Sequence, residues 1–230
     1  MAKPKRSSRV QSVTHFQPKH IKPLTQNQQL TFDLFDKYDH LVLHGHPGTG
    51  KTFLAMYLAI KELLVEKNGY DRVIIIRSVV PVRDIGFLPG TIGEKIEVYE
   101  EPYKGIATEL FGRGDAYSIL KQKGMVEFTS TSFLRGETFN NAIVIVDEME
   151  NANLQELCTI ATRVGDNCRI IFSGDVLQSD LQGRERNGVN QFLDILESMN
   201  EIGFVDFGID DIVRSGFVKN FIIAKTAKGL

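Results

Sequence analysis

The chain has 230 residues, and its 27 Lys and Arg residues nearly balance its 29 Asp and Glu residues, for a formal net charge of −2. That length suits one α/β domain with appendages, since two full domains would be cramped. The sequence has neither an apolar run of membrane-spanning length nor a charged-then-apolar leader. We therefore expect a cytoplasmic protein without a membrane partner, and the overall charge does not by itself indicate a nucleic-acid binder.

The amino-terminal segment is basic although the whole chain is not. No acid precedes Asp33, and the basic residues before it include Lys3, Lys5, Arg6, Arg9, Lys19 and Lys22. Such a segment either follows nucleic-acid phosphates, releasing counterions as it neutralises them, or is a solvated, disordered terminus. We predict a flexible basic tail over 1–21 and a single domain over 22–230, and both interpretations of the tail stay open.

The first motif that carries chemistry lies between a predicted strand and a predicted helix. An apolar run over 41–43 is followed by residues 45–52, which match G-x-x-x-x-G-K-[ST], and then by a helix-like stretch. Only a loop between a strand end and a helix start aims several backbone N–H groups at one polyphosphate. We predict a phosphate-binding P-loop, and a glycine-rich turn that matches by chance is the alternative.

The residue types in this loop fit a nucleoside triphosphate with Mg²⁺. Glycines allow positive φ and close backbone approach, Lys51 would reach the β and γ oxygens, and the Thr52 hydroxyl would ligate Mg²⁺. Pro47 stiffens the loop. The residues expected to contact the nucleotide here are Gly45, His46, Pro47, Gly48, Thr49, Gly50, Lys51, Thr52 and Phe53.

Short β-branched runs alternate with helical stretches along the chain. The predicted strands are 41–44, 73–77, 126–129, 142–146, 170–173 and 204–207, and the main predicted helices are 52–67, 154–163 and 189–199. Nearly continuous apolar strands separated by helices indicate a three-layer α/β fold with a mostly parallel central sheet. Asn153 with Glu156 resembles a capping box at the start of the second helix.

Two other segments carry weaker structural expectations. Over 78–125, residues such as Pro81, Gly86 and Pro102 interrupt the pattern, so we expect a long insertion beside the site instead of a plain crossover. Cys158 and Cys168 sit in apolar surroundings without zinc-ligand spacing. We expect both to be reduced core thiols in a reducing compartment.

Acidic and polar residues follow two of the predicted strands. Asp147 and Glu148 come directly after the 142–146 strand, at the sheet edge where the P-loop also lies. Asp147 would then hold the Mg²⁺ that Thr52 ligates, and Glu148 would orient and deprotonate the attacking water. After the 170–173 strand, Asp175 and Gln178 are either turn formers or sensors of the γ-phosphate.

Taken together, these motifs resemble the PhoH-like family of ATPases, whose domain is similar to the first motor domain of superfamily 1 helicases. The resemblance extends from residue 22 to about residue 225 and is carried by residues 22–28, 45–52, 77–81, 86–90, 133–136, 146–148, 173–181 and 212–215. It implies that residues 22–230 form a single RecA-like ATPase domain that uses ATP and Mg²⁺.

The resemblance also implies roles for residues outside the P-loop. Gln28 would hydrogen-bond the adenine edge, Gln178 would sense the γ-phosphate, and Arg214 would be an arginine finger. The simpler alternatives are a polar helix face for Gln28 and a surface ion pair for Arg214. Arg135 would contact either phosphate or nucleic acid. One departure is Met149-Glu150 after the acidic pair, where many relatives have Ala-Gln, so we expect catalysis to be retained and its coupling to nucleic acid to be altered.

A finger arginine contributes about 10³–10⁵ in rate, and a lone lobe without one should be slow. If Arg214 projects from the domain flank, it completes a neighbouring chain's site. By analogy with other RecA-like assemblies, we expect a homo-oligomer, with a hexameric ring as the leading form.

Three functions remain open from the sequence. The first is an ATPase coupled to single-stranded RNA or DNA, supported by the basic tail and by Arg77, Arg83 and Lys95. Phe87 and Phe133 would stack bases in that case, or simply pack in the protein. The second is a small-molecule kinase, in which Glu148 and Gln178 would have no task. The third is a nucleotide-dependent scaffold with little turnover, against which an intact Glu148 argues.

Overall fold

Parallel strands form the centre of the structure, a computed structural model that describes residues 16–65, 67–78, 92–134, 136, 138–175 and 188–228, with the backbone alone for 92–96. Within these residues one sheet has the strand order β3-β2-β4-β5-β1-β6, and every pairing is parallel. The strands are β1 (His40–Gly45), β2 (Arg72–Arg77), β3 (Val126–Ser130), β4 (Ala142–Asp147), β5 (Cys168–Gly174) and β6 (Ile202–Phe207). All six predicted strands are confirmed.

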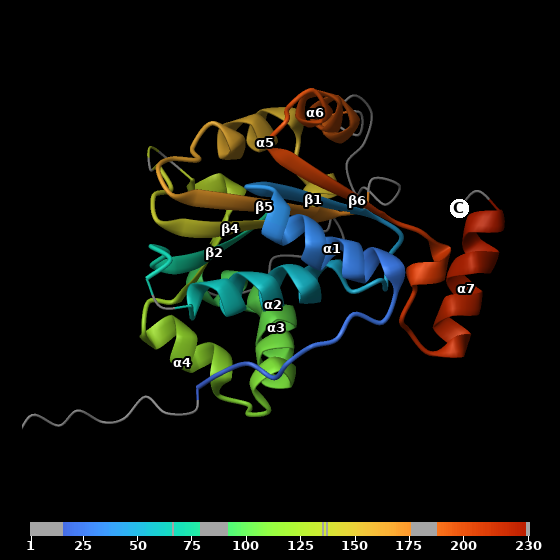
Figure 1. Ribbon diagram of the computed structural model, residues 1–230, viewed down its shortest axis with the longest axis horizontal. Helices are drawn as coiled ribbons and strands as arrows, with labels where there is room; N and C mark the ends of the chain where they lie inside the picture. The colour runs from blue at the N-terminus through green and yellow to red at the C-terminus, as the bar shows by residue number, and fades with distance from the viewer. Residues whose placement is uncertain are drawn as a thin grey trace, which may run out of the picture.

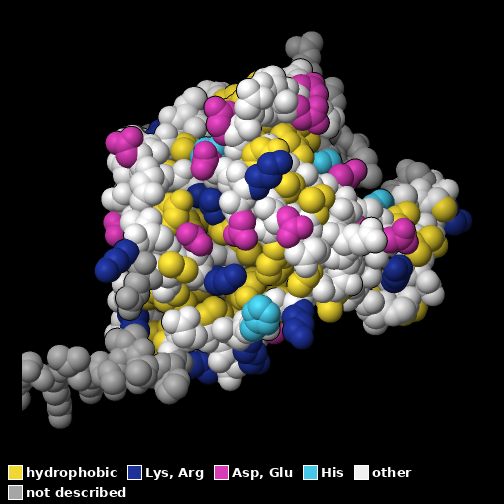
Figure 2. All heavy atoms as spheres, viewed as in Figure 1, with side chains coloured by type: hydrophobic (Ala, Val, Ile, Leu, Met, Phe, Trp, Pro, Cys, Tyr) yellow, Lys and Arg dark blue, Asp and Glu magenta, His cyan; other side chains and the backbone are white. Residues whose placement is uncertain are grey.

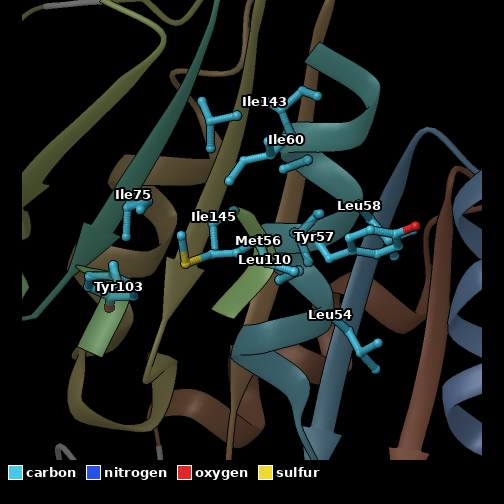
Figure 3. Packing of buried hydrophobic residues seen from close by; sticks show 14 of the residues in the cluster. Leu54, Met56, Tyr57, Leu58, Ile60, Ile75, Tyr103, Leu110, Ile143 and Ile145 are labelled. Atoms are coloured by element: carbon cyan, nitrogen blue, oxygen red, sulfur yellow. The ribbon is translucent and has the colours of Figure 1, made fainter. Parts of the chain in front are cut away.

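The strands are apolar on both faces because helices cover the sheet on both sides. Every residue of β4 is buried; Ile143 and Ile145 join one core cluster, and Val144 and Val146 join the other. Figure 3 shows that Ile75, Ile143 and Ile145 lie on the same face of the sheet, in the first of these clusters. This arrangement confirms the predicted three-layer α/β fold.

In the part of the chain that the structure describes, four helices cover the first face and two cover the second (Figure 1). The first group is α1 (Gln26–Lys37), α2 (Lys51–Leu63), α3 (Ile92–Phe111) and α4 (Ala116–Gln122). The second group is α5 (Leu154–Ala161) and α6 (Gly188–Glu197). The helices predicted over 52–67, 154–163 and 189–199 thus exist with slightly shorter bounds. None of the helices in the described residues combines the length and apolar character that crossing a membrane requires.

The expectation for 78–125 is only partly right. Residues 79–91 lie outside the described residues, but α3 and α4 then form the connection between β2 and β3. Pro102 does not break the segment, since it lies inside α3. The helix continues there because its inner side packs on the sheet: Tyr103, Ala107 and Leu110 are all fully buried. α3 also lies beside the candidate site, as expected of this segment.

Local signals account for where some helices begin. The Thr25 side chain accepts a hydrogen bond from the Gln28 N–H at the start of α1. The predicted capping box of α5 is confirmed: Asn153 Oδ1 accepts from the Glu156 N–H at 3.0 Å, and Glu156 Oε2 accepts from the Asn153 N–H at 2.9 Å. Each bond satisfies an N–H group that has no partner within the helix.

The two ends of the described chain behave differently. Residues 16–21, which belong to the predicted tail, run along the domain, because Phe16 stacks on Phe111 and the Lys19 N–H donates to the Leu110 carbonyl. The flexibility of 1–15 lies outside the described residues. At the other end, α7 (Gly216–Ala227) stands away from the sheet in Figure 1 and contains no buried residue.

Both cysteines are free thiols, as predicted. Cys158 and Cys168 are half-buried, and each packs against the edge of the core cluster on the α5 and α6 side instead of lying at its centre. Burial raises the pKa of Cys168 to about 11, so this thiol is the less reactive, protonated form at neutral pH.

Candidate nucleotide site

The predicted P-loop connects β1 to α2 at the carboxyl edge of the sheet. Gly45 has a φ of 116°, and a Cβ there would lie 2.2 Å from the Phe207 carbonyl oxygen of β6. Gly48 and Gly50 also have positive φ, at 76° and 88°. Glycine is therefore required at these positions for close approach and for left-handed backbone. The local sequence pattern correctly identified a tight loop at this edge.

Lys51 lies at the first position of α2 and folds back over the loop. Its Nζ donates to the Gly45 carbonyl at 2.8 Å and to the His46 carbonyl at 2.7 Å. Burial lowers the pKa of this ammonium, and the carboxylate of Asp175 opposes that effect most strongly. The cation is thus held at the mouth of the loop by carbonyls and acidic side chains together.

Asp147, at the end of β4, joins the P-loop to the acidic side of the site. Its Oδ1 accepts a hydrogen bond from Thr52 Oγ1 at 2.8 Å, and its Oδ2 accepts one from the Tyr103 hydroxyl at 2.8 Å. Burial raises the pKa of Tyr103 well above its usual range, and the neighbouring Asp147 raises it further. The two segments that the sequence placed at one rim of the sheet therefore meet.

Glu148, the next residue, has left-handed backbone with φ 50° and ψ 48°. This conformation is uncommon for a residue with a Cβ, and it turns the chain sharply out of β4. The Glu148 carboxylate forms an ion pair with Arg77 at the end of the neighbouring strand β2. Burial alone would lower the pKa of Arg77, but Glu148 beside it raises the pKa overall.

Glu150 adds a further carboxyl group behind the acidic pair. It is buried, and its Oε2 accepts a hydrogen bond from the Asp175 N–H at 3.0 Å. Burial raises the pKa of Glu150 to about 8, so the carboxyl is mostly protonated at neutral pH. Gly174 makes room for it, because a Cβ at residue 174 would lie 2.2 Å from Glu150 Oε2.

These groups surround a cleft of about 910 Å³. Predicted site residues that line the cleft are Gln28, Pro47, Gly48, Gly50, Lys51, Thr52, Phe53, Asp147, Glu148 and Arg214. Gly45, His46 and Thr49 do not line it. They shape the loop instead: Gly45 and His46 accept from Lys51, and Thr49 Oγ1 donates to the His46 carbonyl. Gln178 and Arg135 lie outside the described residues.

Gln28 ties the amino-terminal segment to the P-loop. Its Nε2 donates to the Thr49 carbonyl at 3.0 Å, and its Oε1 accepts from the Leu24 N–H at 2.8 Å. The buried amide uses one of its two N–H donors and one of its two oxygen lone pairs, so each end keeps one further hydrogen bond for an adenine edge. The adenine role stays a prediction.

Arg214 lies on the P-loop of its own chain. The Val213 N–H donates to the Gly48 carbonyl at 3.0 Å, and a Cβ on Gly48 would lie 2.8 Å from Arg214 Cγ. The exposed arginine therefore borders the same cleft as Lys51. Its role as a finger stays a prediction, and this position does not require a neighbouring chain.

Several residues that line the cleft or lie behind its wall are not among the predicted site residues. Tyr103 contacts Asp147, Arg77 pairs with Glu148, and Ile21, Leu24 and Val213 give the cleft an apolar end. Tyr103 could not be found because its helix was not predicted. Arg77 stands at the end of a correctly predicted strand, and that position was the available signal for it.

The donor groups fit a divalent cation that is shared with a nucleotide. Among the described residues, no group of three or more His, Cys, Asp or Glu side chains could hold a metal by itself. Mg²⁺ typically takes one or two protein oxygens and completes its shell with water and substrate phosphates. Thr52 Oγ1 and Asp147 Oδ1 at one end of the cleft match that pattern.

The fold and the site together define a P-loop NTPase: a three-layer parallel α/β domain with a glycine loop, its lysine, and an acidic pair at the same sheet edge. A family model described as PhoH-like protein matches residues 20–225. The chain belongs to the PhoH-like family.

Relatives in this family are about one-third identical to the chain. A PhoH-like protein of Mycobacterium leprae (strain TN) is 34% identical over 209 residues, which are 90% of this chain and 58% of that protein. Protein PhoH of Escherichia coli (strain K12) is 35% identical over 182 residues, 78% of this chain and 51% of that protein. The chain thus spans between half and three-fifths of the length of these relatives.

A solved structure supports the same fold. The large terminase from a thermophilic bacteriophage superposes with a TM-score of 0.52 over 87% of this chain and 50% of that one, at 13% identity. Similarity at that level of identity concerns the fold alone.

Proposed function

We propose that the chain binds ATP with Mg²⁺ and hydrolyses it. The observation that carries this proposal is the Thr52–Asp147 hydrogen bond, which brings the end of the P-loop and the acidic pair to one cleft. Chance P-loop matches have no reason to meet a strand-end carboxylate in this way.

Each group has a task in that reaction. Lys51 would donate to β- and γ-phosphate oxygens in place of the loop carbonyls, and Thr52 and Asp147 would hold Mg²⁺, which would supply neutralising charge for the phosphates. Glu148 accepts a proton from the attacking water, and Gln178 senses the γ-phosphate. Arg214 neutralises charge that develops on the phosphates in its own chain's cleft.

The Arg77–Glu148 ion pair is the main constraint on this assignment. The guanidinium fixes the orientation of the Glu148 carboxylate and occupies one of its two oxygens. Glu148 therefore acts on water with the oxygen that Arg77 leaves free, or after the pair has loosened.

We also propose that ATP hydrolysis is coupled to single-stranded nucleic acid, RNA or DNA. Exposed Lys19, Lys22 and Lys123 support this, as does the gathering of Lys and Arg side chains along the lower edge of Figure 2. Phe133 is 53% exposed and available for stacking on a base. Phe87, Arg83 and the Lys95 side chain lie outside the described residues.

Association between copies of the chain is a third part of the proposal. Phe217 is 80% exposed and Phe221 is 61% exposed on α7, a helix without buried residues. A helix with apolar side chains on several sides normally packs against another element. A second copy of the chain would supply that partner.

The test measures phosphate release from Mg-ATP without an added acceptor, alone and with single-stranded RNA or DNA. We expect hydrolysis, and stimulation by a polymer that weakens as salt rises. Glu148→Gln should bind nucleotide normally and hydrolyse it at least about 100-fold more slowly, in keeping with the usual contribution of general acid–base groups.

Glu109→Gln is the matched control. Glu109 is an exposed carboxylate of α3 that lines the cleft. Phosphate transfer that requires a small-molecule acceptor would indicate a kinase instead. Binding without steady turnover would indicate a scaffold. Absence of stimulation by either polymer would remove the nucleic-acid part.

A further inference from the structure

Tyr103 lies buried behind the wall of the cleft and contacts the acidic pair directly. Its side chain is fully buried, and its hydroxyl donates to Asp147 Oδ2 at 2.8 Å. The other carboxylate oxygen, Oδ1, accepts from Thr52 Oγ1 at 2.8 Å. Three groups from α3, β4 and α2 therefore form one hydrogen-bonded chain.

The direction of these bonds matters for the cation site. A carboxylate only accepts hydrogen bonds, so the Thr52 proton points toward Asp147 and the lone pairs of the Thr52 oxygen point elsewhere. The Tyr103 hydroxyl fixes the carboxylate from the opposite side. Rotation of the carboxylate about its Cβ–Cγ bond would break both contacts together.

Packing holds the tyrosine ring in place. The ring lies 5.6 Å from the Phe128 ring of β3, centroid to centroid, and Figure 3 shows it on the same side of the sheet as Ile75 and Ile145. Residues on either side of it in α3, Pro102 and Gly105, line the cleft. The hydroxyl thus reaches Asp147 from a wall of the cleft that is firmly packed on the sheet.

We propose that Tyr103 is a positioning residue for the divalent cation. Its hydroxyl orients Asp147, and through Asp147 it orients Thr52. Asp147 Oδ1 and Thr52 Oγ1 are then both available to the cation that would accompany the nucleotide. This inference rests on the proposed function only in requiring a nucleotide bound with a divalent cation. Partners that orient a metal ligand typically contribute about 10–100-fold to metal affinity.

The experiment measures binding of a fluorescent ATP analogue to the full chain, first in EDTA and then across a Mg²⁺ titration. Tyr103→Phe removes only the hydroxyl and keeps the ring. We expect its affinity in EDTA to equal that of the unmodified protein and its half-maximal Mg²⁺ concentration to rise by about 10-fold or more. Tyr117→Phe likewise removes only the hydroxyl of a buried tyrosine, in α4, and should change neither value.

An unchanged Mg²⁺ dependence in Tyr103→Phe would overturn the inference and leave the proposed function standing. Binding that ignores Mg²⁺ in the unmodified protein would overturn both. If Tyr103→Phe does not fold, Phe128→Leu decides, because it loosens the ring and keeps the hydroxyl. A raised half-maximal Mg²⁺ concentration in that variant supports the inference, and an unchanged one overturns it.

Discussion

Lys51 and Glu150 show how single side chains set the charge balance of the cleft. Burial lowers the pKa of Lys51, and the carboxylate of Asp175 opposes that effect most strongly. Glu150 responds in the opposite way, because burial raises its pKa and it keeps its proton. A protonated Glu150 therefore reduces the negative charge of a cleft that Lys51, Arg77 and Arg214 line with positive charge.

Lys51→Ala should weaken nucleotide binding, because each charge-assisted hydrogen bond lost contributes about 1.5–3 kcal/mol. A titration with a fluorescent ATP analogue measures the effect as a rise in Kd of about 10-fold or more. Lys61→Ala, an exposed lysine in the last turn of the same helix, is the control and should bind as before. Equal affinity in both variants would mean that Lys51 does not contact the triphosphate.

Glu150 predicts a dependence of stability on pH. Its pKa is about 8 in the folded chain and 4.5 in the unfolded one, so the folded state binds more protons between these values. The free energy of unfolding therefore falls as pH rises through that window, with a slope of up to about 1.4 kcal/mol per unit from this group. The decrease in the free energy of unfolding that Glu150 causes should level off above about pH 8.

Glu150→Gln cannot ionise, and the slope assigned to this group should disappear. Urea denaturation at several values from about pH 5 to about pH 9 measures it, with exposed Glu109→Gln as the control. If the two variants and the unmodified protein show parallel pH profiles, Glu150 does not titrate in this range.

At the scale of elements, helix starts and strand ends position the site. α5 begins at a capping box, and α3 supplies a wall of the cleft although it contains Pro102. Strand patterns were predictable because buried parallel strands are apolar over their whole length. α1, α3, α4 and α7 were not predicted, since their apolar periodicity is weak or interrupted by glycine and proline.

Asn153→Ala should destabilise the protein by about 0.5–2 kcal/mol, the usual effect of removing an N-cap side chain. Chemical denaturation measures this as a lower midpoint with an unchanged slope. Gln155→Ala, exposed in the first turn of the same helix, should have little effect. No difference between the two variants would show that the capping box contributes nothing measurable.

At the scale of the whole molecule, the strand order decides what meets in the cleft. β5 lies between β1 and β4, so Gly174 and Asp175 come between the P-loop and the acidic pair. The chain then returns through β6, and Val213 and Arg214 close over Gly48. Lys51, Glu148 and Arg214 therefore line the same cleft within a single chain.

Arg214→Ala should slow hydrolysis and leave nucleotide affinity nearly unchanged, because the arginine lies over Gly48 of the P-loop and would act mainly on charge that develops in the transition state. Mixing this variant with Glu148→Gln tests where the arginine acts. We expect no recovery of activity, whether the protein is a monomer or an oligomer in Mg-ATP, since Arg214 lies on the P-loop of the same chain. Recovery on mixing would show that sites are shared between chains.

The sequence by itself determined the P-loop, the acidic pair and the six strands. Each of them is specified by a short run of consecutive residues: the glycine spacing of the loop, the apolar run of a strand, or the two acids directly after one. The contacts of Tyr103 with Asp147 and of Arg77 with Glu148 were decided only by the tertiary structure. These partners are 44 and 71 residues apart in the chain, and they meet because parallel strands end at one edge and α3 packs beside them. No local pattern encodes such a meeting, since it depends on how whole elements pack.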